Sequence, residues 1–204
     1  MRPNTIDIDV ADANLTGFAS NVTGATFTIT TTETSDGLAH QVSIRNDSAT
    51  DHSGKTVTLV GTDANGAALT EVVTGPGTSA TVESAGYFKT LTSATPSATI
   101  GADTFDIGWV DEVASHTYIL DWPRGNGATI SVDVTGTLDF TVQETFVDVL
   151  GGVAPVWQSI SSLAAKTADT TGSSTVGATA IRIILNSYSS GAELQMYTVQ
   201  PSYN

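Results

Sequence analysis

The stretch 138–146 reads Leu138-Asp139-Phe140-Thr141-Val142-Gln143-Glu144-Thr145-Phe146, and its first six residues alternate between apolar and polar. An alternation with a period of two residues places one set of side chains on each face of a β-strand. Similar alternation recurs in residues 5–10, 25–30, 41–45, 55–60, 128–134, 180–185 and 192–199. The sequence therefore predicts an all-β protein, with the last two runs forming an antiparallel pair.

Turn sequences separate these runs. Asn-Gly and Asp-Gly steps favour the positive backbone angles of tight hairpins, and such signals occur at residues 35–37, 63–66, 75–77, 125–127 and 189–191. A single short stretch, residues 159–165, has a helical pattern. Short turns between recurrent strands predict an antiparallel β-sandwich or a jelly-roll-like fold rather than βαβ units.

A change in composition suggests where the chain divides. Residues 93–99 are small, and the aromatic content rises after Phe105. We therefore expect two β modules, residues 1–114 with an N-terminal arm and residues 115–204, although one interleaved sandwich would give a nearly identical pattern. The first 18 residues are expected to form a docking arm or a domain-linking strand, because Pro3 removes a ladder donor and disfavours a central strand. An ordinary first strand of the sandwich is the alternative.

Charge and composition limit the functional classes. The chain has 204 residues with a net charge of −14, so it repels phosphate backbones, and a nucleic-acid partner is not expected. It has no Cys, which excludes disulfides and thiolate chemistry. The sequence contains neither an apolar signal region nor a membrane-spanning run, and no membrane partner is expected.

The search for catalytic residues gives no assignment. The three histidines, His40, His52 and His116, lie outside any Gly-x-Ser-x-Gly nucleophile elbow, and we interpret them as surface or turn residues. Paired carboxylates for glycoside hydrolysis meet in space, so the sequence does not single out two of them. No phosphate-binding glycine loop follows a strand and opens a helix. We therefore expect a protein that is not an enzyme, with no catalytic residue and no cofactor.

Carboxylates could supply oxygen ligands to a hard cation such as Ca²⁺. The candidate groups are Asp7 with Asp9, Asp47 with Asp51, and Asp103 with Asp106 and Asp111. The turn at Asp63–Gly66 lacks the rest of an acidic calcium loop. We interpret these residues as solvated carboxylates on sheet edges and turns, so no metal-binding residue is assigned.

Aromatic residues raise a second class of function. Trp122 and Trp157 lie next to Pro or in a turn-like setting, where a sugar-stacking platform could form. Most aromatic side chains in a thin β-sandwich are instead core or subunit-interface anchors. A glycan thus stays a candidate ligand without an assigned site.

Two regions carry a resemblance to a known class of proteins. The run Lys55-Thr56-Val57-Thr58-Leu59-Val60-Gly61-Thr62-Asp63-Ala64-Asn65-Gly66, followed by Gly86-Tyr87-Phe88-Lys89-Thr90-Leu91-Thr92-Ser93, resembles a module of tailed-bacteriophage virion structural proteins. In the C-terminal half, residues 142–149, 155–157 and 180–188 resemble the second half of such proteins. The resemblance lies in the general character of these strand and turn sequences rather than in an invariant motif, and it implies no catalytic residue.

The resemblance implies a β-sandwich accessory protein of the virion, made in the host cytoplasm. The function we expect is a capsid decoration (cement) protein that binds the major capsid protein or other virion proteins and associates with itself as a dimer or trimer. The alternative is a carbohydrate- or receptor-binding module of the tail or fibre.

Overall fold

The computed structural model describes residues 4–120 and 127–200, which are almost entirely β-strands and turns. The all-β prediction is confirmed, and within these residues the helical structure consists of one 3₁₀ turn, η2 (Ser161–Leu163), inside the segment with the helical pattern. The chain folds into two compact units, residues 11–113 and residues 1–10 with 114–204. We call them the inner unit and the outer unit, from their order along the chain.

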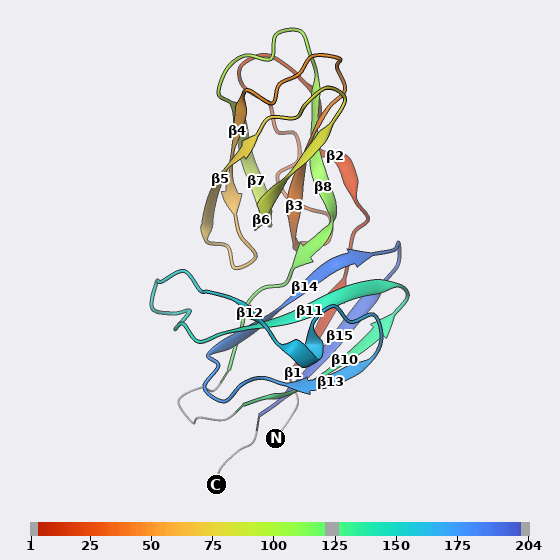
Figure 1. Ribbon diagram of the computed structural model, residues 1–204, viewed down its shortest axis with the longest axis vertical. Coiled ribbons are helices and arrows are strands. Elements are labelled where there is room, and N and C mark those ends of the chain that lie inside the picture. The colour runs from red at the N-terminus through yellow and green to blue at the C-terminus, as the bar shows by residue number, and fades with distance from the viewer. Residues whose placement is uncertain (1–3, 121–126, 201–204) are drawn as a thin grey trace. The chain divides into compact units, whose positions relative to one another are not determined.

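The inner unit is built from antiparallel strands in two sheets (Figure 1). One sheet contains β2 (Asn14–Val22), β8 (Phe105–Ala114), β3 (Ala39–Asn46) and β6 (Thr81–Phe88). The other has the order β5 (Ala68–Thr74), β4 (Thr56–Thr62) and β7 (Thr90–Pro96). Alternate side chains of both sheets form one core, which includes Phe18, Ile44, Leu59, Leu91 and Phe105. The antiparallel, sandwich-like prediction is thus confirmed for this unit.

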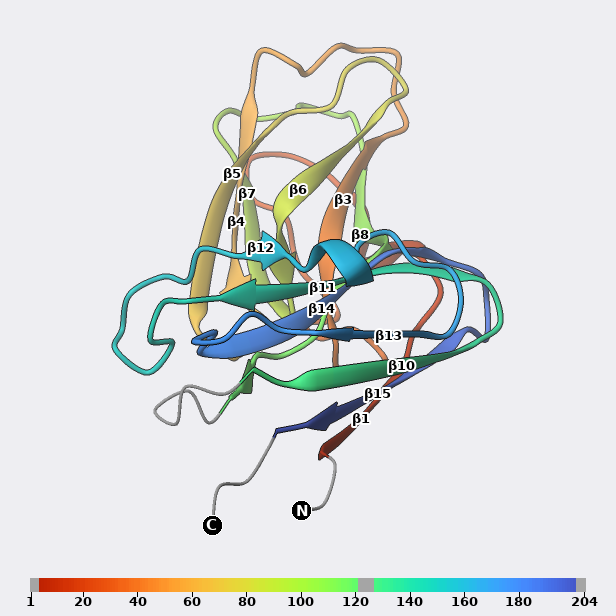
Figure 2. The ribbon, with the colours of Figure 1, turned by 60° about the horizontal axis from the view of Figure 1, so that its bottom comes forward.

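The outer unit also has two layers, which Figure 2 shows one above the other. The first has the order β1 (Asn4–Asp9), β15 (Glu193–Val199), β10 (Thr129–Thr135) and β13 (Thr170–Ser173). The second contains β12 (Gln158–Ser159), β11 (Leu138–Thr145) and β14 (Ala180–Tyr188), with the short β9 (Tyr118–Ile119) paired to β14. Ile130, Phe140, Leu163, Ile183 and Met196 are fully buried in this unit.

The first ten residues belong to a different unit from the one in which the sequence analysis placed them. The expected first module was residues 1–114, but β1 pairs along its whole length with β15, from Asn4 opposite Thr198 to Asp9 opposite Glu193. Ile6 and Ile8 are buried, whereas the intervening Asp7 is exposed. The N-terminal segment is therefore an edge strand of the outer unit, because its apolar stripe completes that unit's core. The expected C-terminal module starts at residue 115, and the outer unit resumes at Ala114.

Two strand predictions are wrong. Residues 25–30 form no strand, and Phe27 alone bridges to Ala94, whereas the strand β2 forms over residues 14–22, where no alternating run is predicted. The runs 180–185 and 192–199 do form strands β14 and β15, but they do not pair with each other. The turn at residues 189–191 instead carries the chain from one layer to the other.

Candidate functional site

His40 lies in β3 with its side chain fully buried. Its Nε2 is 2.8 Å from Asp36 Oδ2, and its Nδ1 is 3.1 Å from the carbonyl oxygen of Val110. Both neighbours are acceptors, so both bonds form together only when both ring nitrogens carry protons. The interpretation of His40 as a surface residue is wrong, because its side chain is fully buried, with the ring of Trp109 in β8 as a neighbour.

Asp36 is held by several donors besides His40. Its carboxylate accepts hydrogen bonds from the backbone N–H groups of Ala11, at 2.8 Å, and Leu38, at 2.9 Å. Burial acts to raise the pKa of Asp36, but the hydrogen bond from His40 and those from the backbone outweigh it and lower the pKa to about 2. The pair therefore fixes the turn at residues 34–38 to β3.

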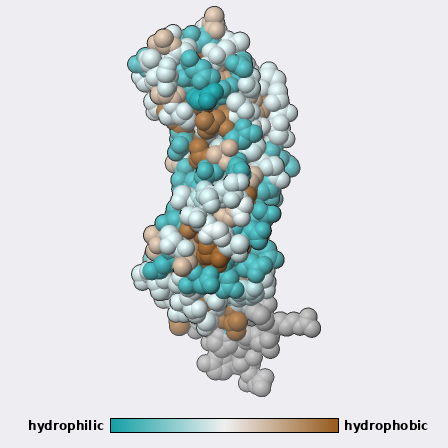
Figure 3. Space-filling view, turned by 90° about the vertical axis from the view of Figure 1, so that its right-hand side faces the viewer, coloured by the Kyte–Doolittle hydropathy of each residue, from teal (hydrophilic) through white to brown (hydrophobic). Residues whose placement is uncertain are grey.

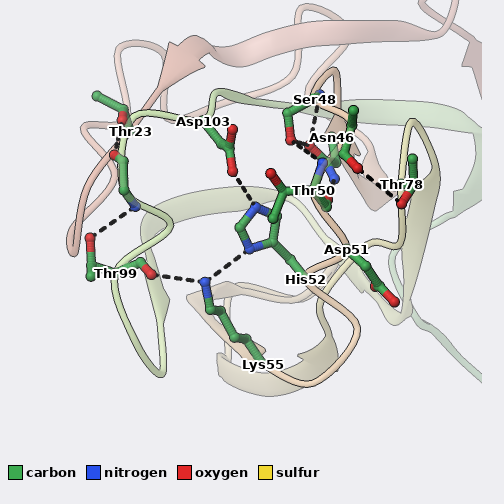
Figure 4. Close-up of polar contacts among 12 residues, drawn as sticks. Thr23, Asn46, Ser48, Thr50, Asp51, His52, Lys55, Thr78, Thr99 and Asp103 are labelled. Atoms are coloured by element: carbon green, nitrogen blue, oxygen red, sulfur yellow. Dashed lines mark hydrogen bonds and ion pairs between the residues drawn. The ribbon is translucent and has the colours of Figure 1, made fainter.

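His52 is the centre of a second polar cluster, drawn in Figure 4. The side chain is 2% exposed, with Nε2 2.9 Å from Asp103 Oδ2 and Nδ1 2.9 Å from Lys55 Nζ. Lys55 Nζ also donates to the carbonyl oxygen of Thr99 at 2.9 Å. His52 does lie in a turn as predicted, but it is buried there.

The surrounding loops are joined by further hydrogen bonds. The Asn46 amide donates to the carbonyl oxygens of Thr50 and Gly77, both at 2.8 Å, and its oxygen accepts from Ser48. A hydrogen bond from the Thr50 side chain lowers the pKa of Asp103. Desolvation acts to raise this pKa, and the hydrogen bond from His52 lowers it further. Residues 46–55 and 97–103 are thereby held together at one end of the inner unit.

Asp103, His52 and Lys55 are hydrogen-bonded in a row, as in an acid–base relay, but their role is structural. A relay needs a nucleophile whose proton the imidazole can accept. Here the acceptor nitrogen of His52 is occupied by an ammonium group, which also donates to a backbone carbonyl. The arrangement can hold two loops together, and it offers no activated nucleophile among its members.

His116 is exposed, as predicted, in the outer unit. Its ring lies 4.0 Å, centre to centre, from that of Tyr118, and the Tyr118 hydroxyl is 3.2 Å from His116 Nδ1. Burial, with a smaller effect of the charge on Asp7, raises the pKa of Tyr118 well above its usual range. The two rings form a small cluster at the start of β9.

Three of the carboxylates considered as cation ligands each bind a different partner. Asp103 binds His52, Asp106 lies 2.7 Å from Arg45, and Asp111 accepts the Ala13 N–H at 2.8 Å. Burial works to raise the pKa of Asp106, but hydrogen bonds from the backbone of Asn21 and from Arg45 lower it.

Among the remaining acidic candidates of the described residues, contacts are at most pairwise, as where Asp47 and Asp106 share Arg45. Asp47 pairs with Arg45, while Asp51 accepts the Ser53 N–H, which lowers the pKa of Asp51. Asp7 and Asp9 lie on the exposed face of β1. Within residues 4–120 and 127–200, no three His, Cys, Asp or Glu side chains meet as a metal-binding group would require.

Of the two tryptophans considered for sugar stacking, Trp157 is half-buried and Trp122 lies outside the described residues. The guanidinium carbon of Arg182 is 4.6 Å from the centre of the Trp157 ring, and Arg182 Nε donates to Gln143. This cation–π contact covers one face of the ring. A sugar ring could stack only on the other face.

Comparisons with known proteins identify no family. No family model matches the chain, and no curated protein matches it. Among solved structures, the major capsid protein P2 from bacteriophage PM2 is similar over 98% of this chain and 99% of that chain, at 11% sequence identity and a TM-score of 0.21. A TM-score this low does not establish a common fold, so no functional argument rests on it. No helix of the described part of the chain is long and apolar enough to span a bilayer.

Proposed function

We propose that this chain is a non-enzymatic structural protein of a bacteriophage virion, and specifically a decoration (cement) protein that binds and stabilises the head. The sequence resemblance in residues 55–66 and 86–93 supports this class. Those residues form β4 with its turn and the adjoining parts of β6 and β7, all regular strands of the inner unit. An accessory role of this kind depends on surfaces rather than on a reactive group.

The observation that carries the proposal is how the titratable side chains of the inner unit are used. His40 and His52 are both buried and bound to carboxylates. Asp106 is likewise held by Arg45 and by the backbone of Asn21. These groups stabilise loops and sheet ends, which suits a rigid protein that presents surfaces to a partner.

Quantitative mass spectrometry of purified virions, from the phage that encodes this chain, tests the proposal. We expect the chain in a fixed ratio to the major capsid protein, as lattice binding requires. Its absence from intact virions would contradict the proposal. A low copy number together with glycan binding would favour the tail- or fibre-associated alternative.

A further inference from the structure

Large apolar side chains are exposed at one end of the outer unit. Leu150 is 78% exposed and Val153 is 63% exposed, in the loop between β11 and β12. We define the apolar end as the exposed residues Ile119, Phe146, Leu150, Val153, Val156 and Val176. By contrast, on the face drawn in Figure 3 the apolar areas are small and are separated by polar ones. Exposed large apolar side chains that gather at one end of a unit mark candidate interaction sites.

Hydrogen bonds bring these segments together. The loop before β14 is joined to the end of β11, because Thr175 binds the Glu144 carboxylate and Thr179 donates to the carbonyl oxygen of Val147 at 2.6 Å. Ile119 is opposite Ala180 in the β9–β14 pair. The loop between β11 and β12 projects from the ends of these strands in Figures 1 and 2. Its turn is closed by Asp148, which accepts the Leu150 N–H at 3.0 Å.

The apolar end also carries little charge. Residues 144–157 and 174–180 contain no Lys or Arg, although Arg182 of β14 lies over the Trp157 ring. Of their two acidic residues, Glu144 is buried, whereas Asp148 is exposed and accepts the Leu150 N–H. In a chain with a net charge of −14, these two segments thus expose one acidic side chain.

We propose that the apolar end is the surface through which two copies of this chain associate. Molecules that each carry a large negative charge repel one another, so close contact between them is favoured where the surface carries little charge. A basic partner would be bound by a group of exposed carboxylates, and an anionic bilayer by basic residues. The apolar end, with one exposed acidic side chain, favours neither of them.

The adjacent edge strand supports a second copy as the occupant. β12 lies at the edge of its sheet, and both of its residues, Gln158 and Ser159, are exposed. An edge strand can pair antiparallel with its own copy across a twofold axis, which makes the contact self-complementary. Val156 lies two residues before this strand, so main-chain pairing and apolar contact would occur in one interface.

Sedimentation velocity of the full chain tests the proposal, over about 10 to 500 µM and in about 50 mM and 500 mM NaCl. We expect a concentration-dependent dimer that strengthens with salt, because salt screens the repulsion between like net charges. Val153→Asp should weaken it at least tenfold, by placing a charge in the contact. Circular dichroism and thermal melting of each variant establish that it is folded.

The matched control is Val72→Asp, since Val72 is 60% exposed but lies on β5 of the inner unit. It should leave the dimer unchanged. A monomer throughout the concentration range, or a dimer weakened by Val72→Asp and not by Val153→Asp, would overturn the proposal. So would a monomer that floats with phosphatidylcholine vesicles, which would make the apolar end a lipid-binding surface. The result is independent of whether the chain is found in virions.

Discussion

Gly17 lies directly against the indole ring of Trp109. A Cβ at this position would come within 2.1 Å of the Trp109 ring, which is buried and packs edge-on against Phe18 with ring centres 5.1 Å apart. The indole N–H is also fixed, because it donates to the carbonyl oxygen of Asp12 at 3.0 Å. The ring therefore has little freedom to move away.

We predict that Gly17→Ala lowers the free energy of unfolding by about 1–3 kcal/mol, the usual cost of overpacking a core. Chemical denaturation followed by circular dichroism measures it. Gly54→Ala is the control, since nothing lies within 4 Å of a Cβ built at Gly54. Equal stability of the two variants would show that the Trp109 ring can yield.

Asp36 makes the stability of the fold depend on pH. Its pKa of about 2 in the folded state lies below the ordinary value of 3.8. The ionised form thus stabilises the fold at pH values above about 4, and this contribution is lost as the pH falls towards about 2. The Asp36 side chain is 6% exposed, so solvent screens the interaction little, and a shift of this size corresponds to about 2 kcal/mol.

Asp36→Asn should remove this dependence. Between about pH 5 and pH 2, the wild type should lose about 2 kcal/mol more unfolding free energy than the variant does. Asp133→Asn, at an exposed position of β10, should behave like the wild type. Parallel stability curves for the wild type and Asp36→Asn would contradict the role of the His40–Asp36 pair.

At the scale of elements, Glu71 joins β5 to β6. Its two carboxylate oxygens accept the backbone N–H groups of Ala85 and Gly86, at 2.7 and 2.8 Å. Here the register between β3 and β6 shifts, so the sheet leaves these donors without their regular ladder partners.

Glu71→Gln replaces one acceptor with an amide group that cannot accept. We expect it to destabilise the chain by roughly 1–2 kcal/mol, because a charge-assisted hydrogen bond is lost and a donor faces a donor. Hydrogen exchange should show faster exchange of the Ala85 and Gly86 amides. Glu83→Gln, at an exposed position of the same strand, should leave both amides protected, and equal behaviour of the two variants would disprove this function of Glu71.

The strand β1 provides a second test of an element. Ile8 is 3% exposed and opposite Leu194 in β15, so Ile8→Ala should cost about 2–4 kcal/mol in unfolding free energy. Asp9→Ala, at the exposed end of the same strand, should cost far less. If Ile8→Ala leaves stability unchanged but abolishes binding to particles, then β1 is a docking arm and its pairing with β15 is not needed for folding.

Local patterns predicted most strands, because alternation in runs such as 41–45 and 138–146 follows directly from one buried face. They failed for β2, where the ladder to β8 has register shifts and the alternation is lost. They also failed for the pairing of β14 and β15, because the choice of partner depends on contacts far apart in sequence.

The two histidine–aspartate pairs also differ in whether the sequence could predict them. Asp36 and His40 are four residues apart, so their contact was within reach of local reasoning about the turn. His52 and Asp103 are separated by 51 residues, and no sequence spacing reveals such a pair. The buried state of both histidines follows from tertiary packing.

At the scale of the whole molecule, the proposed function is binding to a phage head. A decoration protein occupies equivalent sites on a lattice, so its binding must saturate at a fixed ratio to the major capsid protein. A chain with a net charge of −14 should also bind neither nucleic acid nor an anionic surface, which separates lattice binding from adhesion to released genomes.

The most direct test adds the purified chain to heads produced by a phage from which its gene has been deleted. Bound protein is measured after sedimentation of the particles, and retention of the packaged DNA is measured on heating. We expect saturable binding at a fixed ratio to the major capsid protein, together with DNA release at a higher temperature. Heads that bind none of the added protein, or that carry a full complement yet release their DNA at an unchanged temperature, would contradict the proposed function.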